Sequence, residues 1–236
     1  MKLNSWETLF GNVRVVVFAG HYGSGKSEIS VQYARLMAQT GRRVLLADMD
    51  IVNPFFRSLD ARALLEVDGV HVVAPLFANT NVDVPALVPE ITSALRDPET
   101  FVVLDVGGDG DGARVLGRYH RDFDPKELAM VFVFNASRPM TRTAETAALQ
   151  MEEIAFASRQ RFTHILNNTH LLDETTGALV AEGERQARRL ADMQGLPLAG
   201  TVMVPESDAA QSESSLGAVF EAPVLPLIRT LGVHFD

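Results

Sequence analysis

Three glycines, a lysine and two serines lie within residues 20–27, where the sequence reads GHYGSGKS. The spacing is G-x-x-x-x-G-K-S, with Gly20, Gly25, Lys26 and Ser27 at the fixed positions. Glycines let backbone N–H groups turn inward around an anion, because no Cβ blocks the approach. A lysine at this place contacts the outer phosphates of a nucleotide, and the hydroxyl that follows it binds Mg²⁺. These residue types therefore predict a phosphate and magnesium site.

The residues that flank this loop support the same interpretation. The run VRVVVF at residues 13–18 is β-branched and apolar, as in a buried parallel strand, and apolar residues recur at helical spacing from Ile29 to Met37. The alternative, a glycine-rich turn before a helix with an exposed lysine, explains the spacing less well. The predicted phosphate-binding residues are Gly20, His21, Tyr22, Gly23, Ser24, Gly25, Lys26, Ser27 and Glu28.

Short apolar runs alternate with amphipathic stretches along most of the chain. The expected strands are residues 13–18, 43–47, 70–74, 101–105, 129–134, 164–166 and 198–204. The expected helices are residues 25–40, 83–96, 142–159, 176–194 and a shorter one from 214. This alternation predicts an α/β fold with one doubly wound, mostly parallel sheet and helices on both faces. No linker interrupts the pattern, so we expect residues 1–236 to form a single nucleotide-binding domain.

Acidic residues end two of the expected strands, where ligands of parallel sheets bind. The second strand is followed by Asp48 and Asp50, and the fourth ends at Asp105 before a glycine-rich segment, residues 107–112. Asp48 or Asp50 alone could simply terminate a strand or cap a turn. Beside a phosphate loop, a carboxylate at this place organises Mg²⁺ or water. We expect the glycine-rich segment to be a loop that responds to the γ-phosphate.

Composition excludes several other classes of function. The net charge is −9, which argues against a surface that coats DNA, RNA or an anionic membrane. Cysteine is absent, so disulfides, thiolate metal sites and cysteine-held iron–sulfur clusters are excluded. The first residues lack the apolar core of a signal peptide, and no apolar run approaches the roughly 20 residues that span a bilayer. We therefore expect a cytoplasmic protein.

Five motifs together resemble the MinD/ParA-like P-loop ATPases, the group that includes cobyrinic acid synthase-type and nitrogenase iron protein-type nucleotide-binding domains. The motifs are GHYGSGKSE, DMDIVNP, LDVGGDGDG and ILNNTHL, followed late in the chain by VMVPESDAAQ. The resemblance covers nearly the whole chain. Its phosphate loop is the most specific motif, and the other motifs are moderately specific.

The resemblance implies roles for individual residues. Asp50 would orient the attacking water and reach Mg²⁺ through water, and Asp105 would be the Walker B aspartate. Asn167 would recognise the adenine amino group. Pro205 and Asp208 would belong to the segment that closes over the base.

One position departs from the family pattern. Most members carry a second, signature lysine directly after the first glycine of the loop, and it reaches the partner subunit's nucleotide in a dimer. Here this place holds His21, which has shorter reach and weaker charge. It could replace that lysine in a nucleotide-dependent homodimer, or it could merely fill the loop. The C-terminal residues lack the basic amphipathic helix of the members that bind membranes.

Basic residues also occur outside these motifs. Arg138, after the expected strand 129–134, could contact the nucleotide or a partner subunit, or could merely pack the loop. The arginines at 185, 188 and 189 share a helix with two glutamates and are expected to form a solvated face.

The sequence as a whole predicts a Mg²⁺-dependent ATPase that acts as a nucleotide-driven switch for an unidentified protein partner. The predicted catalytic residues are Lys26 and Asp50, and the predicted metal ligands are Ser27, Asp50 and Asp105. ATP is preferred over GTP because ILNN lacks the N-K-x-D pattern with its guanine-reading aspartate. An ATP-dependent small-molecule ligase or kinase is the main alternative, with a substrate pocket at residues 76–88. A scaffold that binds nucleotide without turnover is a third.

Overall fold

The computed structural model describes residues 6–49, 59–73, 88–108, 110–204 and 220–230. The strands are β1 (Val15–Ala19), β2 (Arg43–Asp48), β3 (Val70–Val73), β4 (Thr100–Val106), β5 (Leu128–Phe134), β6 (His164–Asn167), β7 (Leu198–Met203) and β8 (Val224–Pro226). The helices are α1 (Lys26–Gln39), α2 (Leu59–Val67), α3 (Pro89–Arg96), α4 (Gly110–Arg118), α5 (Ala144–Ser158) and α6 (Gly177–Gln194), with short 3₁₀ turns such as η1 (Trp6–Thr8).

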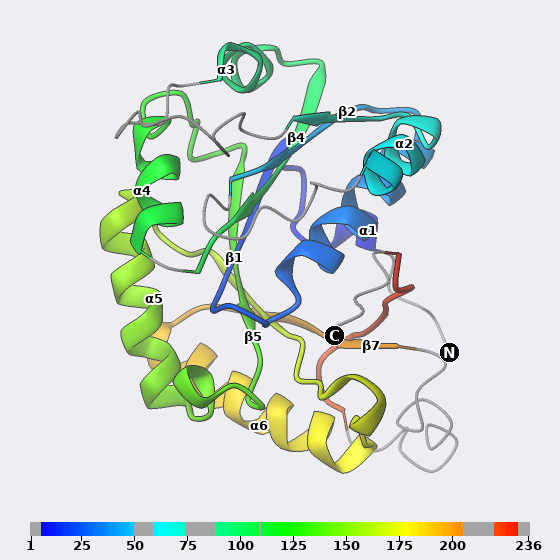
Figure 1. The fold of residues 1–236 in the computed structure, drawn as a ribbon. Helices are drawn as coiled ribbons and strands as arrows, with labels where there is room; N and C mark the ends of the chain where they lie inside the picture. Colours follow the sequence, from blue (N-terminus) through cyan, green and yellow to red (C-terminus); the bar gives the residue numbers. More distant parts are fainter. Residues whose placement is uncertain (1–5, 50–58, 74–87, 109, 205–219, 231–236) are drawn as a thin grey trace.

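The strands form one parallel sheet in the order β3-β2-β4-β1-β5-β6-β7-β8 (Figure 1). The first strand lies inside the sheet, between β4 and β5. The chain passes from β1 through α1 to β2 on one side of this centre, and later returns to β5 on the other side. Because all strands run in parallel, their carboxyl ends meet along one edge, which includes the loop that follows β1.

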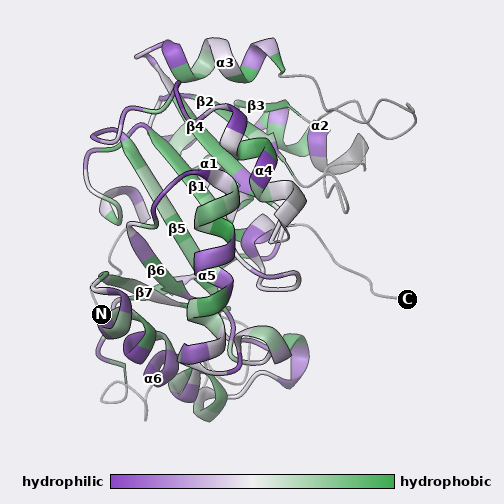
Figure 2. Ribbon diagram, turned by 90° about the vertical axis from the view of Figure 1, so that its left-hand side faces the viewer, coloured by the Kyte–Doolittle hydropathy of each residue, from purple (hydrophilic) through white to green (hydrophobic). Residues whose placement is uncertain are grey.

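Side chains that alternate along the strands supply two separate hydrophobic cores. Val16 and Phe18 of β1 pack on one face with Tyr33 of α1. Val15 and Val17 belong to the opposite face, which α3, α4, α5 and α6 cover. In Figure 2 the central strands are largely hydrophobic, whereas hydrophilic and hydrophobic residues alternate along the helices around them. Burial on both faces explains why these strands are continuous apolar runs rather than alternating ones.

Local sequence signals set several helix ends. Gly25, with φ of +85°, directly precedes α1 in a left-handed conformation that favours glycine. Thr143 and Thr176 cap α5 and α6 by accepting N–H groups from Thr146 and Leu179. Gly195 ends α6 with a φ of +64°.

The fold confirms the predicted α/β class and places each predicted strand within about two residues of its expected bounds. It corrects the expectation that residues 107–112 form a loop, since α4 begins at Gly110. A Cβ on Gly112 would lie 2.8 Å from the Gly107 Cα, so glycine is needed here for close packing as the chain enters the helix. The strand β8 and the helix α2 were not predicted. The helix expected from residue 214 lies outside the described residues, and the described part of 83–96 becomes helical at Pro89.

The segment 224–230, termed here the C-terminal strap, runs along the outer face of α1. Gln32 holds it at two points. Its side-chain amide nitrogen, Nε2, donates to the Pro226 carbonyl at 2.5 Å, and its Oε1 accepts the Ile228 N–H at 2.6 Å. One turn away on either side, Glu28 accepts the Thr230 N–H at 3.1 Å and Arg35 donates to the Thr230 hydroxyl. Trp6 also donates to the Pro226 carbonyl, at 2.9 Å. Residues far apart in the sequence therefore meet on the helix that follows the glycine-rich loop.

Candidate functional site

The loop between β1 and α1 has the backbone that its glycines predict. Gly23 and Gly25 both have positive φ, +73° and +85°. The Ser24 N–H donates to the His21 carbonyl at 3.0 Å and closes the turn. Ser24 and Lys26 are almost fully buried, and within the described ranges the Ser24 hydroxyl has no hydrogen-bond partner. A short loop with left-handed glycines and a buried, unsatisfied hydroxyl is suited to surround an anion.

Side chains that follow the next two strands in the sheet order, β5 and β6, contact carbonyls of this loop. After β5, Arg138 donates from Nε to the Gly23 carbonyl at 2.8 Å. After β6, Asn168 donates to the Ser24 carbonyl at 2.7 Å. A Cβ on Gly25 would lie only 2.2 Å from the Asn168 amide nitrogen, so this packing requires glycine. Both contacts engage carbonyls, so they hold the loop without using the N–H groups that an anion would need.

The two acidic strand ends lie side by side at the same edge. Asp48 and Asp105 are register partners on β2 and β4, and both are fully buried. The segment after Asp105 packs directly on the loop, since a Cβ on Gly108 would lie 2.1 Å from the Gly20 carbonyl oxygen. The fold therefore brings the loop and the Asp105 strand end together. Ser27, the second residue of α1, is partly buried.

Asn167, the predicted adenine-reading residue, lies inside the protein. Its amide nitrogen donates to the Thr201 hydroxyl at 3.3 Å, and its oxygen accepts the Thr169 hydroxyl at 2.8 Å. The side chain is fully buried in this network. Its neighbour Asn168 is the residue that contacts the loop, and the sequence analysis missed it. The sequence signal that could have pointed to Asn168 is the pair of asparagines at the end of β6.

His170 is a second residue that the sequence analysis did not assign to the loop. Its Nε2 lies 3.2 Å from the place that a Cβ on Gly25 would occupy. Burial, together with the positive charges of Arg138 and Arg229, lowers the pKa of His170 to about 4. The imidazole is therefore neutral at neutral pH, and it brings no charge to the loop.

The remaining predicted residues have separate surroundings. Tyr22 is exposed, and His21 places its ring Nδ1 2.9 Å from the Tyr22 carbonyl oxygen. Glu28 faces the C-terminal strap through its bond to the Thr230 N–H. The predicted residues Asp50, Pro205 and Asp208, and residues 76–87 of the alternative substrate pocket, lie outside the described residues.

The donor set at this edge fits a nucleotide with Mg²⁺. A cradle of loop amides and the Lys26 ammonium suit phosphate oxygens, while a hydroxyl and buried carboxylates are the hard oxygen ligands that Mg²⁺ takes. A sequence model of the family described as the CobQ/CobB/MinD/ParA nucleotide-binding domain matches residues 15–216. The chain belongs to this family.

Solved structures share the fold of this nucleotide-binding domain. Cell division protein FtsY from Thermotoga maritima is 18% identical, with a TM-score of 0.54, and the match covers 79% of this chain and 60% of that protein. The signal recognition particle 54 kDa protein from Aeropyrum pernix, in complex with GDP, is 19% identical with a TM-score of 0.53 over 94% of this chain and 43% of that one. The chain thus spans less than two thirds of either protein. No curated protein matched.

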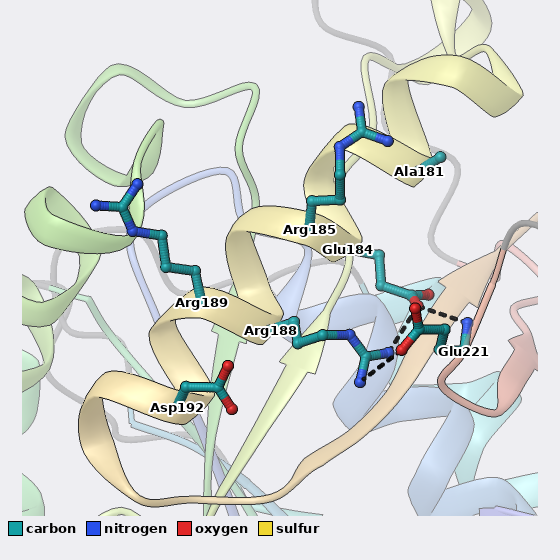
Figure 3. A pocket seen from close by; sticks show the side chains of 7 residues that line it. All are labelled: Ala181, Glu184, Arg185, Arg188, Arg189, Asp192 and Glu221. Carbon is teal, nitrogen blue, oxygen red and sulfur yellow. Dashed lines mark hydrogen bonds and ion pairs between the residues drawn. The ribbon is translucent and has the colours of Figure 1, made fainter.

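A second depression, of about 350 Å³, lies on α6 of the nucleotide-binding domain (Figure 3). Arg188 extends between Glu184 and Glu221, at 3.1 and 3.4 Å. Arg185 and Arg189 pair with Glu182 and Glu145. Carboxylates already face all three arginines, so this surface is an ion-paired helix face, as the sequence predicted, rather than an anion site.

No helix in the described ranges is both long and apolar enough to cross a bilayer.

Proposed function

We propose that this nucleotide-binding domain is a Mg²⁺-dependent ATPase that works as a nucleotide-driven switch for a protein partner. One observation carries the proposal: the backbone after Asp105 packs directly against the first glycine of the loop, at the contact between Gly108 and Gly20. A displacement of the loop when the γ-phosphate is lost would therefore displace the segment that leads into α4. Loss of the γ-phosphate would in this way be coupled to the position of α4.

The roles of the residues follow from their places. Lys26 and the loop amides would hold the phosphates, and Ser27 with Asp105 would hold Mg²⁺, whose charge would offset that of the triphosphate. Asp50 would orient the attacking water. Asp48 lies directly beside Asp105, as its register partner on the neighbouring strand. Phosphoryl transfer depends mainly on positioning and electrostatics, which suits this small set of groups.

The residue that favours ATP over GTP is His170, three positions after the end of β6. In the run NNTH, His170 stands where N-K-x-D has its guanine-reading aspartate. Burial keeps this imidazole neutral at neutral pH. A neutral imidazole has a single acceptor nitrogen, and here Nδ1 already accepts the Leu172 N–H at 3.5 Å, whereas a carboxylate accepts both N–H groups on the edge of guanine.

The test is phosphate release from excess ATP and from excess GTP, each with and without Mg²⁺. We expect many turnovers of ATP with Mg²⁺, slower turnover of GTP, and none without the metal. Lys26→Ala is the control for a contaminating ATPase. Binding of ATP without turnover would overturn the ATPase proposal in favour of a scaffold.

The switch is tested separately by capturing proteins from a lysate on the immobilised domain, with ATP and Asp50→Ala protein in one arm and ADP in the other. A switch binds its partner in only one of these states. Equal capture in both arms would contradict the proposal of a switch, whatever the rate of hydrolysis.

A further inference from the structure

Arg138 lies in a tight turn directly after β5, and the fold holds this turn rigidly. The Asn135 side chain accepts the Ser137 N–H at 2.9 Å, and the Asn135 carbonyl accepts the Thr141 hydroxyl at 2.7 Å. The Thr141 N–H in turn donates to the Arg138 carbonyl at 3.1 Å. These bonds reverse the chain within a few residues and direct the Arg138 side chain towards the glycine-rich loop.

The guanidinium of Arg138 packs directly against Gly23. Its Nε donates to the Gly23 carbonyl, and a Cβ on Gly23 would lie 2.9 Å from Nε and 3.0 Å from Cζ. Gly23 therefore serves two purposes, since its φ is left-handed and its missing side chain makes room for the guanidinium. The contact fixes the guanidinium at the fourth position of the phosphate loop.

The terminal nitrogens of Arg138 remain available to a ligand. In the part of the chain that the structure describes, no carboxylate lies within ion-pair distance of this arginine, and only its Nε makes a side-chain hydrogen bond. Arg14, Arg35 and Arg96, by contrast, each face a carboxylate. A partly buried guanidinium without an anionic partner, at the edge of an anion site, is an incomplete arrangement, because Arg pairs with carboxylate or phosphate in such places.

The charge of Arg138 reaches into the loop region. It is one of the two positive charges that lower the pKa of His170, whose ring lies against Gly25. The positive charge of Arg138 would likewise favour the binding of an anion beside Gly25.

We propose that Arg138 supplies, within the same chain, a second positive charge to the bound nucleotide, by contacting its phosphates through the terminal guanidinium nitrogens. This inference rests on the proposed function. During hydrolysis a water oxygen bonds to the γ-phosphorus while the bond from that phosphorus to the bridging oxygen breaks. The electron pair stays on the leaving diphosphate, and the water proton passes to solvent. Arg138 keeps its protons and stabilises the charge that gathers on the diphosphate.

The decisive variant is Arg138→Gln. The glutamine amide can still donate to the Gly23 carbonyl, so it preserves a purely structural role, but it carries no charge. We expect its kcat for ATP to fall about 10²–10³-fold, as on removal of one preorganised transition-state donor. Its affinity for a non-hydrolysable ATP analogue should fall about tenfold, because a charge-assisted hydrogen bond is lost. Added guanidinium should partly restore turnover to Arg138→Ala, where it can occupy the vacated space.

Arg142→Ala is the matched control, because Arg142 is exposed four residues away and should leave both quantities at their wild-type values. Thermal unfolding of each variant checks that the fold is intact. Wild-type affinity and kcat in Arg138→Gln would overturn the inference and leave Arg138 as loop packing. If the wild-type protein hydrolyses no ATP, the proposed ATPase fails, while the tenfold difference in analogue affinity still decides whether Arg138 contacts the phosphates.

Discussion

Replacing His170 should remove a specific acid sensitivity from the fold. Burial lowers the pKa of His170 to about 4 in the folded protein, compared with 6.5 for an exposed histidine. Well above pH 6.5 the ring is neutral in both states and contributes nothing to the pH dependence. As pH falls from 6.5 to 4 the unfolded chain takes up this proton and the folded protein does not. His170 therefore destabilises the fold over this window.

The size of the effect follows from the two pKa values. At pH 5 the ring is almost fully protonated in the unfolded chain and about one tenth protonated in the folded protein. The linkage relation then gives a loss of about 2 kcal/mol in the free energy of unfolding between pH 7 and pH 5. This is a substantial fraction of the stability of an ordinary domain.

The substitution His170→Asn isolates the effect, because asparagine cannot titrate and its side-chain oxygen can replace Nδ1 as acceptor for the Leu172 N–H. Urea unfolding of the nucleotide-free protein at pH 7 and pH 5 gives the free energy of unfolding. We expect wild-type protein to lose about 2 kcal/mol more than the variant across this interval. His71→Asn removes an exposed histidine from β3 and is the control. Equal losses in wild type and His170→Asn would refute the reasoning.

Three further substitutions test other parts of the site. Lys26→Ala should remove most ATP affinity without changing the circular dichroism spectrum, which calorimetry checks; retained affinity would place the nucleotide elsewhere. Asp50→Ala should bind ATP but lose turnover, because orienting water matters in the transition state; a wild-type rate would shift that role to Asp48. Gly108→Ala should weaken ATP binding at least tenfold, because its Cβ would lie 2.1 Å from the Gly20 carbonyl, whereas Gly110→Ala meets no atom closer than 3.7 Å and should bind normally.

The sequence carried enough information to predict the sheet and the loop, because both are local patterns. Buried parallel strands such as Leu128–Phe134 are continuous apolar runs, and the phosphate loop is defined by spacing. The strand Val224–Pro226 was missed because three residues that include a proline give too weak a pattern. The helix that starts at Gly110 was missed because glycines are poor helix formers and their role is close packing.

The supporting residues of the site could not be predicted, because their partners are distant in sequence. Asn168 contacts a carbonyl 144 positions earlier, and no local pattern distinguishes it from Asn167. The sequence left three interpretations of Arg138 open, namely contact with the nucleotide, contact with a partner subunit and loop packing, and only its contact with Gly23 places it beside the phosphate loop. Such contacts depend on which strand ends the sheet order places next to the loop.

The C-terminal strap on α1 has a consequence for how the protein folds. The bond between Trp6 and Pro226 joins residues 220 positions apart, and closing so long a segment of chain is a slow, entropically costly event. During synthesis the N-terminal part emerges first, so α1 and its phosphate loop leave the ribosome long before residues 224–230 do. Until then the amide of Gln32 has no strap to bind. The outer face of α1 is thus completed among the last steps of folding.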